Sequence, residues 1–349
     1  MKTLDVNVGL YDHYASIEQV YHYYGILAIY GLLRTAEEKG EPELKKRCLD
    51  ILKSFPDGIQ HSRYNFPSYE ICGIPRAYAF MQGYLPEDGE LVRKYAEEMM
   101  NATRDSKGIM SYPHQPEKEL IWIDVAMAVT PFLLFAGLAL GEDRYVDEAV
   151  NQSFLMYDEF FNPDNGLLHQ SKNFNGPGRY SEDHWSRGNG WGYIALTELI
   201  RFLPQNSKHR KKVEDYFVRH SKAFLPHQSK RGLWRQEIPF EYSYEESSGT
   251  ALILYGLGVG LRGGVLDEKT FREPFERGIR GLFAHCVNAD FSTNNSCPGC
   301  LCPGEGEEKG TVKAYVTLKL PHKDEHHSFG PFMLAFVEAH LNGITDLSV

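Results

Sequence analysis

The sequence predicts an all-α protein whose helices form an (α/α)6 barrel, with inner helices ringed by outer ones. Three observations support this prediction. Apolar residues follow helical spacing along most of the chain. The helices come in pairs, of which the first member is the more apolar. Several loops that follow a pair open with Gly and an apolar residue, at Gly58, Gly108, Gly166 and Gly232, which is a loose repeat of one αα-hairpin per unit. An open helical solenoid is the alternative architecture.

The apolar spacing predicts five helical pairs and a last helix, and the residues 315–320 are the best candidate for a strand. No linker or break in composition interrupts the chain, so we expect residues 1–349 to form a single domain. The expected helices are 13–38, 42–54, 68–84, 88–104, 122–140, 142–160, 190–203, 208–225, 246–262, 267–286 and 328–342.

Composition and charge restrict the class of protein. The chain has 349 residues, of which 42% are hydrophobic and 24% charged, so it can bury a large core. Its formal net charge of −10 argues against a nucleic-acid partner. No apolar run is long enough to span a membrane. No apolar leader is visible at the N-terminus, so we expect a cytoplasmic location, or a periplasmic one if a leader has been removed.

Asp124 is the leading candidate for a catalytic acid, because it opens a predicted inner helix among apolar neighbours such as Ile121, Trp122 and Val125. A carboxyl in apolar surroundings has a raised pKa. A raised pKa suits a general acid that works near neutral pH. The alternative is a helix N-cap that satisfies the free amides of the first turn.

A dense polar and aromatic cluster occupies residues 183–192, just before another predicted inner helix. Arg187 could bind a substrate carboxylate through two hydrogen bonds. Trp185 or Trp191 could stack on a sugar ring, and the carboxamide of Asn189 lies between them in the sequence. The alternative is a helix junction that carries a structural Arg–Asp pair.

Two further segments carry candidate residues in loops or at helix starts. His169, in the segment 165–172, could bind a carboxylate or a hydroxyl, or it could be an ordinary surface histidine. Glu70, in the segment 64–73, could be a second acid, or a first-turn glutamate that the helix dipole favours.

Cys297, Cys300 and Cys302 form a C-x-x-C-x-C segment. Structural zinc usually takes four ligands in two spaced pairs, and only one compact trio is present here. We therefore favour free thiols over a zinc site or a redox role, and we expect no metal. No phosphate-binding Gly loop, metalloprotease helix or nucleophile elbow occurs.

At these motifs the chain resembles glycoside hydrolase family 105 and the related family 88. The segment 185–191 (WSRGNGW) is similar to the W-x-R-G/A-x-G/A-W stretch of the family, and 121–128 (IWIDVAMA) to the segment that holds its catalytic aspartate. Residues 232–236 (GLWRQ) and 246–251 (ESSGTA) together resemble the family's paired segments GLWYQ and ExSGSA. Residues 330–338 (GPFMLAFVE) resemble the last helix of the family.

The resemblance implies an (α/α)6 barrel that removes a terminal unsaturated uronic acid from lyase-generated oligosaccharides. In that reaction Asp124 protonates C4 of the C4–C5 double bond and then, as a base, helps water to attack C5. No cofactor is implied, and one tuned aspartate suffices in place of the usual two carboxylates. The substrate-binding residues predicted from the resemblance and the clusters are Trp122, His114, His169, Arg187, Trp191, Asn189 and Trp185.

The main departure from the family lies at 68–73 (SYEICG), where an aspartate is usual. Either Glu70 replaces that acid or the position is lost. Two other hypotheses stay open: another sugar-active enzyme on the same barrel, such as an epimerase or an ordinary glycosidase, and a non-catalytic uronate-binding protein.

Overall fold

The computed structural model describes residues 1–18, 23–56 and 73–348. Four two-residue strands accompany the helices in this part of the chain: β1 (Ile121–Trp122), β2 (Ser171–Lys172), β3 (Trp234–Arg235) and β4 (Glu245–Glu246). The helices are α1 (Thr3–Ile17), α2 (Tyr23–Lys39), α3 (Pro42–Lys53), α4 (Ile74–Met81), α5 (Gly89–Met100), α6 (Asp124–Leu140), α7 (Asp143–Phe160), α8 (Ser186–Phe202), α9 (Arg210–Phe224), α10 (Ser247–Arg262), α11 (Glu268–Cys286), α12 (Val312–Leu318) and α13 (Phe329–Leu341).

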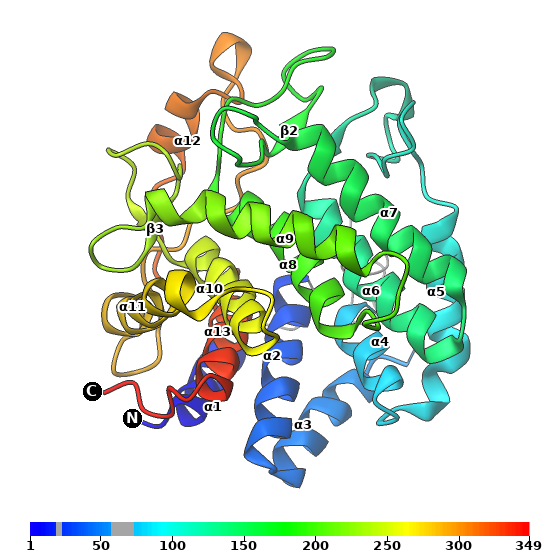
Figure 1. Cartoon of the computed structure of the whole chain (residues 1–349), viewed down its shortest axis with the longest axis vertical. Helices are drawn as coiled ribbons and strands as arrows, with labels where there is room; N and C mark the ends of the chain where they lie inside the picture. Colours follow the sequence, from blue (N-terminus) through cyan, green and yellow to red (C-terminus); the bar gives the residue numbers. More distant parts are fainter. Residues whose placement is uncertain (19–22, 57–72, 349) are drawn as a thin grey trace.

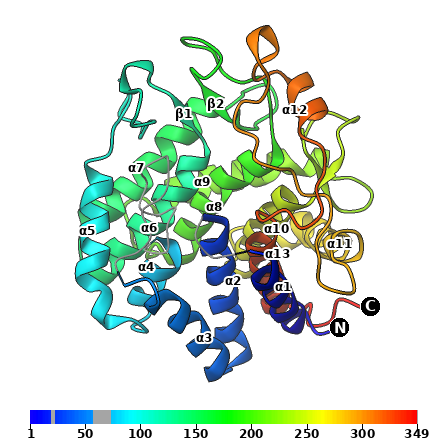
Figure 2. The ribbon, with the colours of Figure 1, turned by 180° about the vertical axis from the view of Figure 1, so that it is seen from behind.

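Six of these helices form a closed inner ring. Each of α2, α4, α6, α8, α10 and α13 packs against the next, and α13 returns to α2. The helices α1, α3, α5, α7, α9 and α11 pack on the outside of this ring (Figures 1 and 2). The predicted (α/α)6 barrel is therefore confirmed, and the open solenoid is wrong.

The inner helices follow from their composition. Helix α10 buries every residue from Ser247 to Leu261, as a helix that is apolar on all sides should. Outer helices bury one stripe only, whose large apolar residues in α11 are Phe271, Phe275, Ile279 and Leu282. The difference between the two patterns assigns each helix to its layer.

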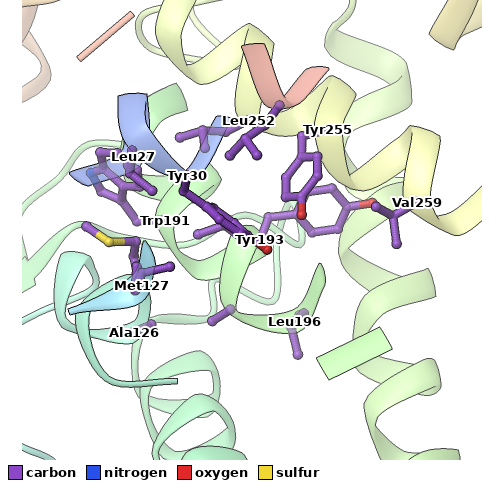
Figure 3. Close-up of a cluster of buried hydrophobic side chains, with 14 of the residues drawn as sticks. Leu27, Tyr30, Ala126, Met127, Trp191, Tyr193, Leu196, Leu252, Tyr255 and Val259 are labelled. Carbon is purple, nitrogen blue, oxygen red and sulfur yellow. The ribbon is translucent and has the colours of Figure 1, made fainter. Parts of the chain in front are cut away.

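Small residues let the inner helices approach closely. A Cβ added to Gly256 of α10 would lie 2.1 Å from the ring of Tyr193 on α8, so only glycine fits there. Figure 3 shows the resulting core, in which side chains of α2, α6, α8 and α10 point toward one another. Close packing of this kind fixes the inner helices relative to each other.

Two sequence predictions were wrong in detail. The expected helix 13–38 is two helices, α1 and α2, because Glu18 adopts an extended conformation that ends α1. Helix α1 is the outer partner missing from the sequence prediction, and it completes six pairs. The candidate strand at 315–320 is wrong because the Thr311 side chain accepts a hydrogen bond from Ala314 N and starts α12 over most of that segment.

The long loops gather at one end of the barrel, with β1, β2 and α12 among them (Figures 1 and 2). There β1 pairs antiparallel with β2, placing Trp122 opposite Ser171. Strand β3 pairs with β4 in the same manner, placing Trp234 opposite Glu246. These short ribbons tie the loops that precede the inner helices. Across the ranges that the structure describes, no helix combines the length and the apolar character that crossing a bilayer requires.

Candidate active site

Asp124 is the first residue of α6 and follows β1 after a single residue, Ile123. Strand β1 lies at the loop end of the barrel (Figure 2). The ribbon fixes its position, because Ile123 N donates to the carbonyl oxygen of Gln170 at 2.8 Å. The residue as a whole is half-buried. Its Oδ2 atom is buried and has no hydrogen-bond partner of good geometry within the described ranges.

The surroundings of Asp124 favour its protonated form near neutral pH. Burial raises the pKa of this carboxyl from 3.8 to about 7, and the negative charge of Asp183 adds to the rise. The Arg187 guanidinium and the Gln170 amide act in the opposite direction and lower the pKa. The balance leaves an acid that can both release and recover a proton near pH 7.

The sequence prediction did not select two further buried carboxyls, of which Asp183 acts on Asp124 and Glu237 interacts with Asp183. Asp183 accepts hydrogen bonds from Trp185 N at 3.1 Å and from Gln170 N at 3.4 Å. Glu237 accepts one from His184 N at 2.8 Å. Burial raises the pKa of both, and the negative charge of Asp183 raises the pKa of Glu237 further. Asp183 opens the cluster 183–192, so its position beside Arg187 was the signal that could have found it.

Arg187 is completely buried and is held by the C-terminal loop. Its Nη1 donates to Ser248 Oγ at 2.9 Å and to the carbonyl oxygen of Cys297, and its Nη2 donates to the carbonyl oxygen of Pro298 at 2.9 Å. The guanidinium also lies 4.5 Å from the ring centre of Trp185. Its charge acts on Asp124 from this anchored position, while its role in binding a substrate carboxylate stays a prediction.

The three predicted tryptophans are all buried. Trp185 packs against Cys297, Cys300 and Tyr315. Trp191 points into the barrel near residues of α2 and α6 (Figure 3). Trp122 makes edge contacts with the rings of Tyr112 at 6.2 Å and Phe174 at 6.0 Å. Their exposed fractions are 2% or less, and their sugar-stacking role stays a prediction.

The remaining predicted residues occupy different positions in the loops. Asn189 clamps the neighbouring loop, because its side chain accepts from Leu168 N at 2.8 Å and donates to Leu168 O at 3.0 Å. His169 is half-buried, 4.7 Å from the ring of His184, and its charge lowers the pKa of Asp183. His114 is exposed beside Tyr112. Glu70 lies outside the described residues.

A cavity of about 890 Å³ lies at the same end of the barrel. Tyr112 and Phe174 line it, and both also contact Trp122, two residues before Asp124. Four lysines reach its wall: Lys107, Lys118, Lys172 and Lys309. Lys107 and Lys172 share the carboxylate of Glu159 at 2.5 Å each. Along the described chain, neither Lys118 nor Lys309 has a carboxylate within salt-bridge distance.

The acidic residues on the cavity wall are largely engaged by the loop itself. Asp105 accepts hydrogen bonds from the backbone N–H groups of Lys107 at 2.9 Å and Ile109 at 2.8 Å. Glu119 accepts from the backbone N–H and the hydroxyl of Ser106 at 2.8 and 2.9 Å. The cavity therefore combines aromatic side chains with ammonium groups that can meet an anion.

The cysteine segment lies beside this site. Cys297, Cys300 and Cys302 are buried and free, and Cys297 Sγ accepts from Gln236 Nε2 at 3.4 Å. Within the described ranges, no group of three His, Cys, Asp or Glu side chains is arranged to hold a metal ion. The segment instead contributes backbone groups to the site, through the carbonyls of Cys297 and Pro298 on Arg187 and the N–H of Cys302 on Gln170.

A six-hairpin barrel with a buried, high-pKa carboxyl at its loop end places this chain among the (α/α)6-barrel glycoside hydrolases. The chain belongs to Glycosyl Hydrolase Family 88, whose family model matches residues 6–342. The predicted relationship to families 88 and 105 is thereby confirmed.

Two curated relatives bear the name unsaturated 3S-rhamnoglycuronyl hydrolase. The protein from Formosa agariphila is 26% identical over 179 residues, which are 48% of this chain and 47% of that protein. The protein from Alteromonas sp. (strain LOR) is 25% identical over 141 residues, 39% of this chain and 34% of its own length. The matches thus span less than half the length of these relatives.

Solved structures resemble this chain over nearly its whole length. The family 105 glycoside hydrolase of C. acetobutylicum ATCC 824 has a TM-score of 0.82 at 21% identity, covering 98% of this chain and 100% of that one. The unsaturated glucuronyl hydrolase of Bacillus sp. GL1 has a TM-score of 0.69 at 15% identity, covering 97% and 95%. At these identities the likeness establishes a shared fold.

Proposed function

We propose that this protein removes a terminal unsaturated uronic acid from lyase-generated oligosaccharides by hydrating the C4–C5 double bond. The observation that carries the proposal is the carboxyl of Asp124, whose pKa of about 7 leaves it partly protonated at neutral pH. Membership of family 88 and the names of the curated relatives support the same reaction.

The proposed chemistry uses the Asp124 carboxyl twice, first as an acid and then as a base. The protonated carboxyl gives its proton to C4, and the positive charge that develops at C5 is shared with the ring oxygen. The carboxylate then accepts a proton from water as the water oxygen bonds to C5, which restores the acid. The product is a hemiketal, and its opening releases the next sugar as an alcohol.

The neighbouring sugar would lie in the cavity beyond Trp122. Tyr112 and Phe174 offer aromatic surface for a sugar ring, and Lys118 and Lys309 offer positive charge for a sulfate or carboxylate on it. A sulfated or acidic second sugar is therefore the proposed substrate class. Replacing both lysines with alanine should raise KM for a sulfated disaccharide more than for its neutral counterpart. Lys313→Ala, at an exposed position of α12, serves as the control. An equal change in KM for both substrates would remove the proposed role of these lysines.

The test of the reaction is the loss of ultraviolet absorbance of an unsaturated uronyl disaccharide. We expect purified protein to remove this absorbance and to release the saturated sugar, and Asp124→Asn to remove nothing. A panel should include unsaturated glucuronyl and galacturonyl substrates with sulfated and neutral second sugars. If none of them loses absorbance, the proposed function is wrong.

The buried carboxyls Asp183 and Glu237 favour a second candidate, an ordinary glycosidase that uses two carboxyl groups. That enzyme would cleave a saturated uronide, such as an aryl glucuronide, whereas the proposed hydratase would not. Calorimetric binding of an unsaturated disaccharide without any product would instead indicate a non-catalytic uronate-binding protein. The three outcomes differ in substrate and in product.

A further inference from the structure

The backbone of Gln170 is fixed beside the catalytic acid. Its carbonyl oxygen accepts from Ile123 N at 2.8 Å, one residue before Asp124. Its N–H lies 3.4 Å from Asp183 Oδ1. The bond between Ile123 and Gln170 continues the β1–β2 pairing, in which Trp122 lies opposite Ser171. The side chain of Gln170 is completely enclosed at this position, with 1% of the residue exposed.

The side-chain oxygen of Gln170 is occupied by the C-terminal part of the chain. Oε1 accepts a hydrogen bond from Cys302 N at 3.2 Å and another from the hydroxyl of Tyr315. Two donors on the oxygen fix the orientation of the amide, because a flip would turn the N–H groups toward those donors. The nitrogen Nε2 must therefore point the other way.

Nε2 of Gln170 and Oδ2 of Asp124 form a matched donor and acceptor. Both atoms are buried, and neither has another hydrogen-bond partner among the described residues. Buried polar atoms of this kind are normally paired. The Gln170 amide is also one of the groups that stabilise the Asp124 carboxylate.

We propose that Gln170 is a positioning residue, whose amide holds the Asp124 carboxylate after its proton has moved to C4. The segment from Cys302 to Tyr315 holds that amide in its working orientation. This inference rests on the proposed function, in which Asp124 must alternate between the two protonation states. It gives the cysteine-containing loop a role through its backbone N–H, without any chemistry at sulfur.

The effect of the amide has a definite sign. An N–H donor stabilises the ionised carboxyl and so opposes the burial that raises its pKa. Besides this neutral amide, two charged groups act on Asp124: Arg187 on α8 and Asp183 in the loop before α8. Both residues remain in the variants below. The Tyr315 hydroxyl also lowers the pKa of Asp183, so its loss favours neutral Asp183 and would lower the pKa of Asp124. An upward change in the titration of Asp124 therefore reports on the amide.

The kinetic test compares Gln170→Leu with the wild-type enzyme. Leucine keeps the apolar stem of the side chain and removes both amide groups. We expect the alkaline limb of the pH profile of kcat/KM to move upward by about one pH unit, the size that one hydrogen bond to a carboxylate produces. Because the amide acts on the acid and not on the substrate, kcat should fall more than KM changes.

Two further variants separate positioning from simple loss of structure. Tyr315→Phe removes one of the two donors on Oε1 and should move the limb in the same direction by less. Gln236→Leu is the matched control, because Gln236 also braces the loop, through Lys319 O at 3.0 Å, without acting on Asp124. Gln236→Leu should leave the limb in place. If Gln170→Leu does not fold, Tyr315→Phe alone decides the matter.

A measurement that needs no turnover distinguishes this inference from the proposed function. Infrared spectra of protein with isotope-labelled aspartate, compared with those of Asp124→Asn, give the titration of the Asp124 carboxyl directly. We expect its midpoint to be higher in Gln170→Leu and Tyr315→Phe than in wild type and in Gln236→Leu. Equal midpoints in all four proteins would overturn the positioning role, whereas failure of the wild type on every unsaturated substrate would overturn only the proposed reaction.

Discussion

Replacing Asp124 with asparagine should make the protein more stable at neutral and alkaline pH. The folded carboxyl has a pKa of about 7, against an ordinary value of 3.8. Between these values the unfolded chain is ionised while the folded one keeps its proton, so the wild type loses stability as the pH rises. Asparagine has nearly the same shape and cannot ionise, so the variant escapes that loss.

The magnitude follows from the two pKa values. A gap of about three units corresponds to about 4 kcal/mol at 1.36 kcal/mol per unit. Asp124 keeps some contact with solvent, so we expect the measured gain to be about half of that, about 2 kcal/mol above pH 7. The gain should shrink to zero as the pH approaches the ordinary pKa of aspartate.

Urea unfolding of both proteins at several values between about pH 4.5 and about pH 8 measures this difference. Asp267→Asn is the control. The side chain of Thr270 and its N–H, which donates to the Asp267 carboxylate at 2.9 Å, both lower the pKa of Asp267 below its ordinary value. That stabilisation is complete above the ordinary pKa, so its difference from wild type should be flat over this range. A flat difference for Asp124→Asn as well would show that Asp124 is an ordinary ionised aspartate and refute the reasoning.

Three further predictions concern the barrel. Arg201→Met leaves the buried Glu198 without its cationic partner at 3.2 Å and should reduce the free energy of unfolding by about 3 to 5 kcal/mol, measured in urea; a loss below about 1 kcal/mol would contradict this. His220 is buried, and burial lowers its pKa from 6.5 to about 3, so below pH 6.5 only the unfolded state gains the proton. At about pH 5, His220→Phe should therefore be more stable than the wild type by about 2 kcal/mol. Identical acid-unfolding curves for the two proteins would contradict this prediction. Gly256→Ala places a Cβ 2.1 Å from Tyr193 and should destabilise by roughly 1 to 3 kcal/mol; an unchanged melting temperature would argue against the tight packing of α8 on α10.

The inner helices were predictable because their residues are apolar on all sides, and that property is local. The division of the expected helix 13–38 into α1 and α2 was not predictable, because it depends on the extended conformation of Glu18. Asp124 could be found from its apolar neighbours and its motif. Gln170 could not, because its meaning comes from Cys302 and Tyr315, which are 132 and 145 positions away in the sequence. No local pattern states which distant donor will hold a given amide.

The burial of the tryptophans also exceeded what the sequence indicates. The motif places two indoles beside an arginine, which fits either a sugar platform or a packed junction. The structure packs Trp185 under the cysteine loop with the Arg187 guanidinium on its face. Packing between segments that are about 110 residues apart decides this arrangement, so composition alone could not.

The closure of the ring has a consequence for biosynthesis. Helix α13 fills the place between α10 and α2, so these two helices lack a neighbour on one side until residues 329–341 have left the ribosome. A nascent chain without them exposes apolar helix faces, and such faces invite aggregation. Joining helices from opposite ends of the chain is also slow. We therefore expect synthesis of this protein to depend on chaperones that shield the open barrel until its last inner helix arrives.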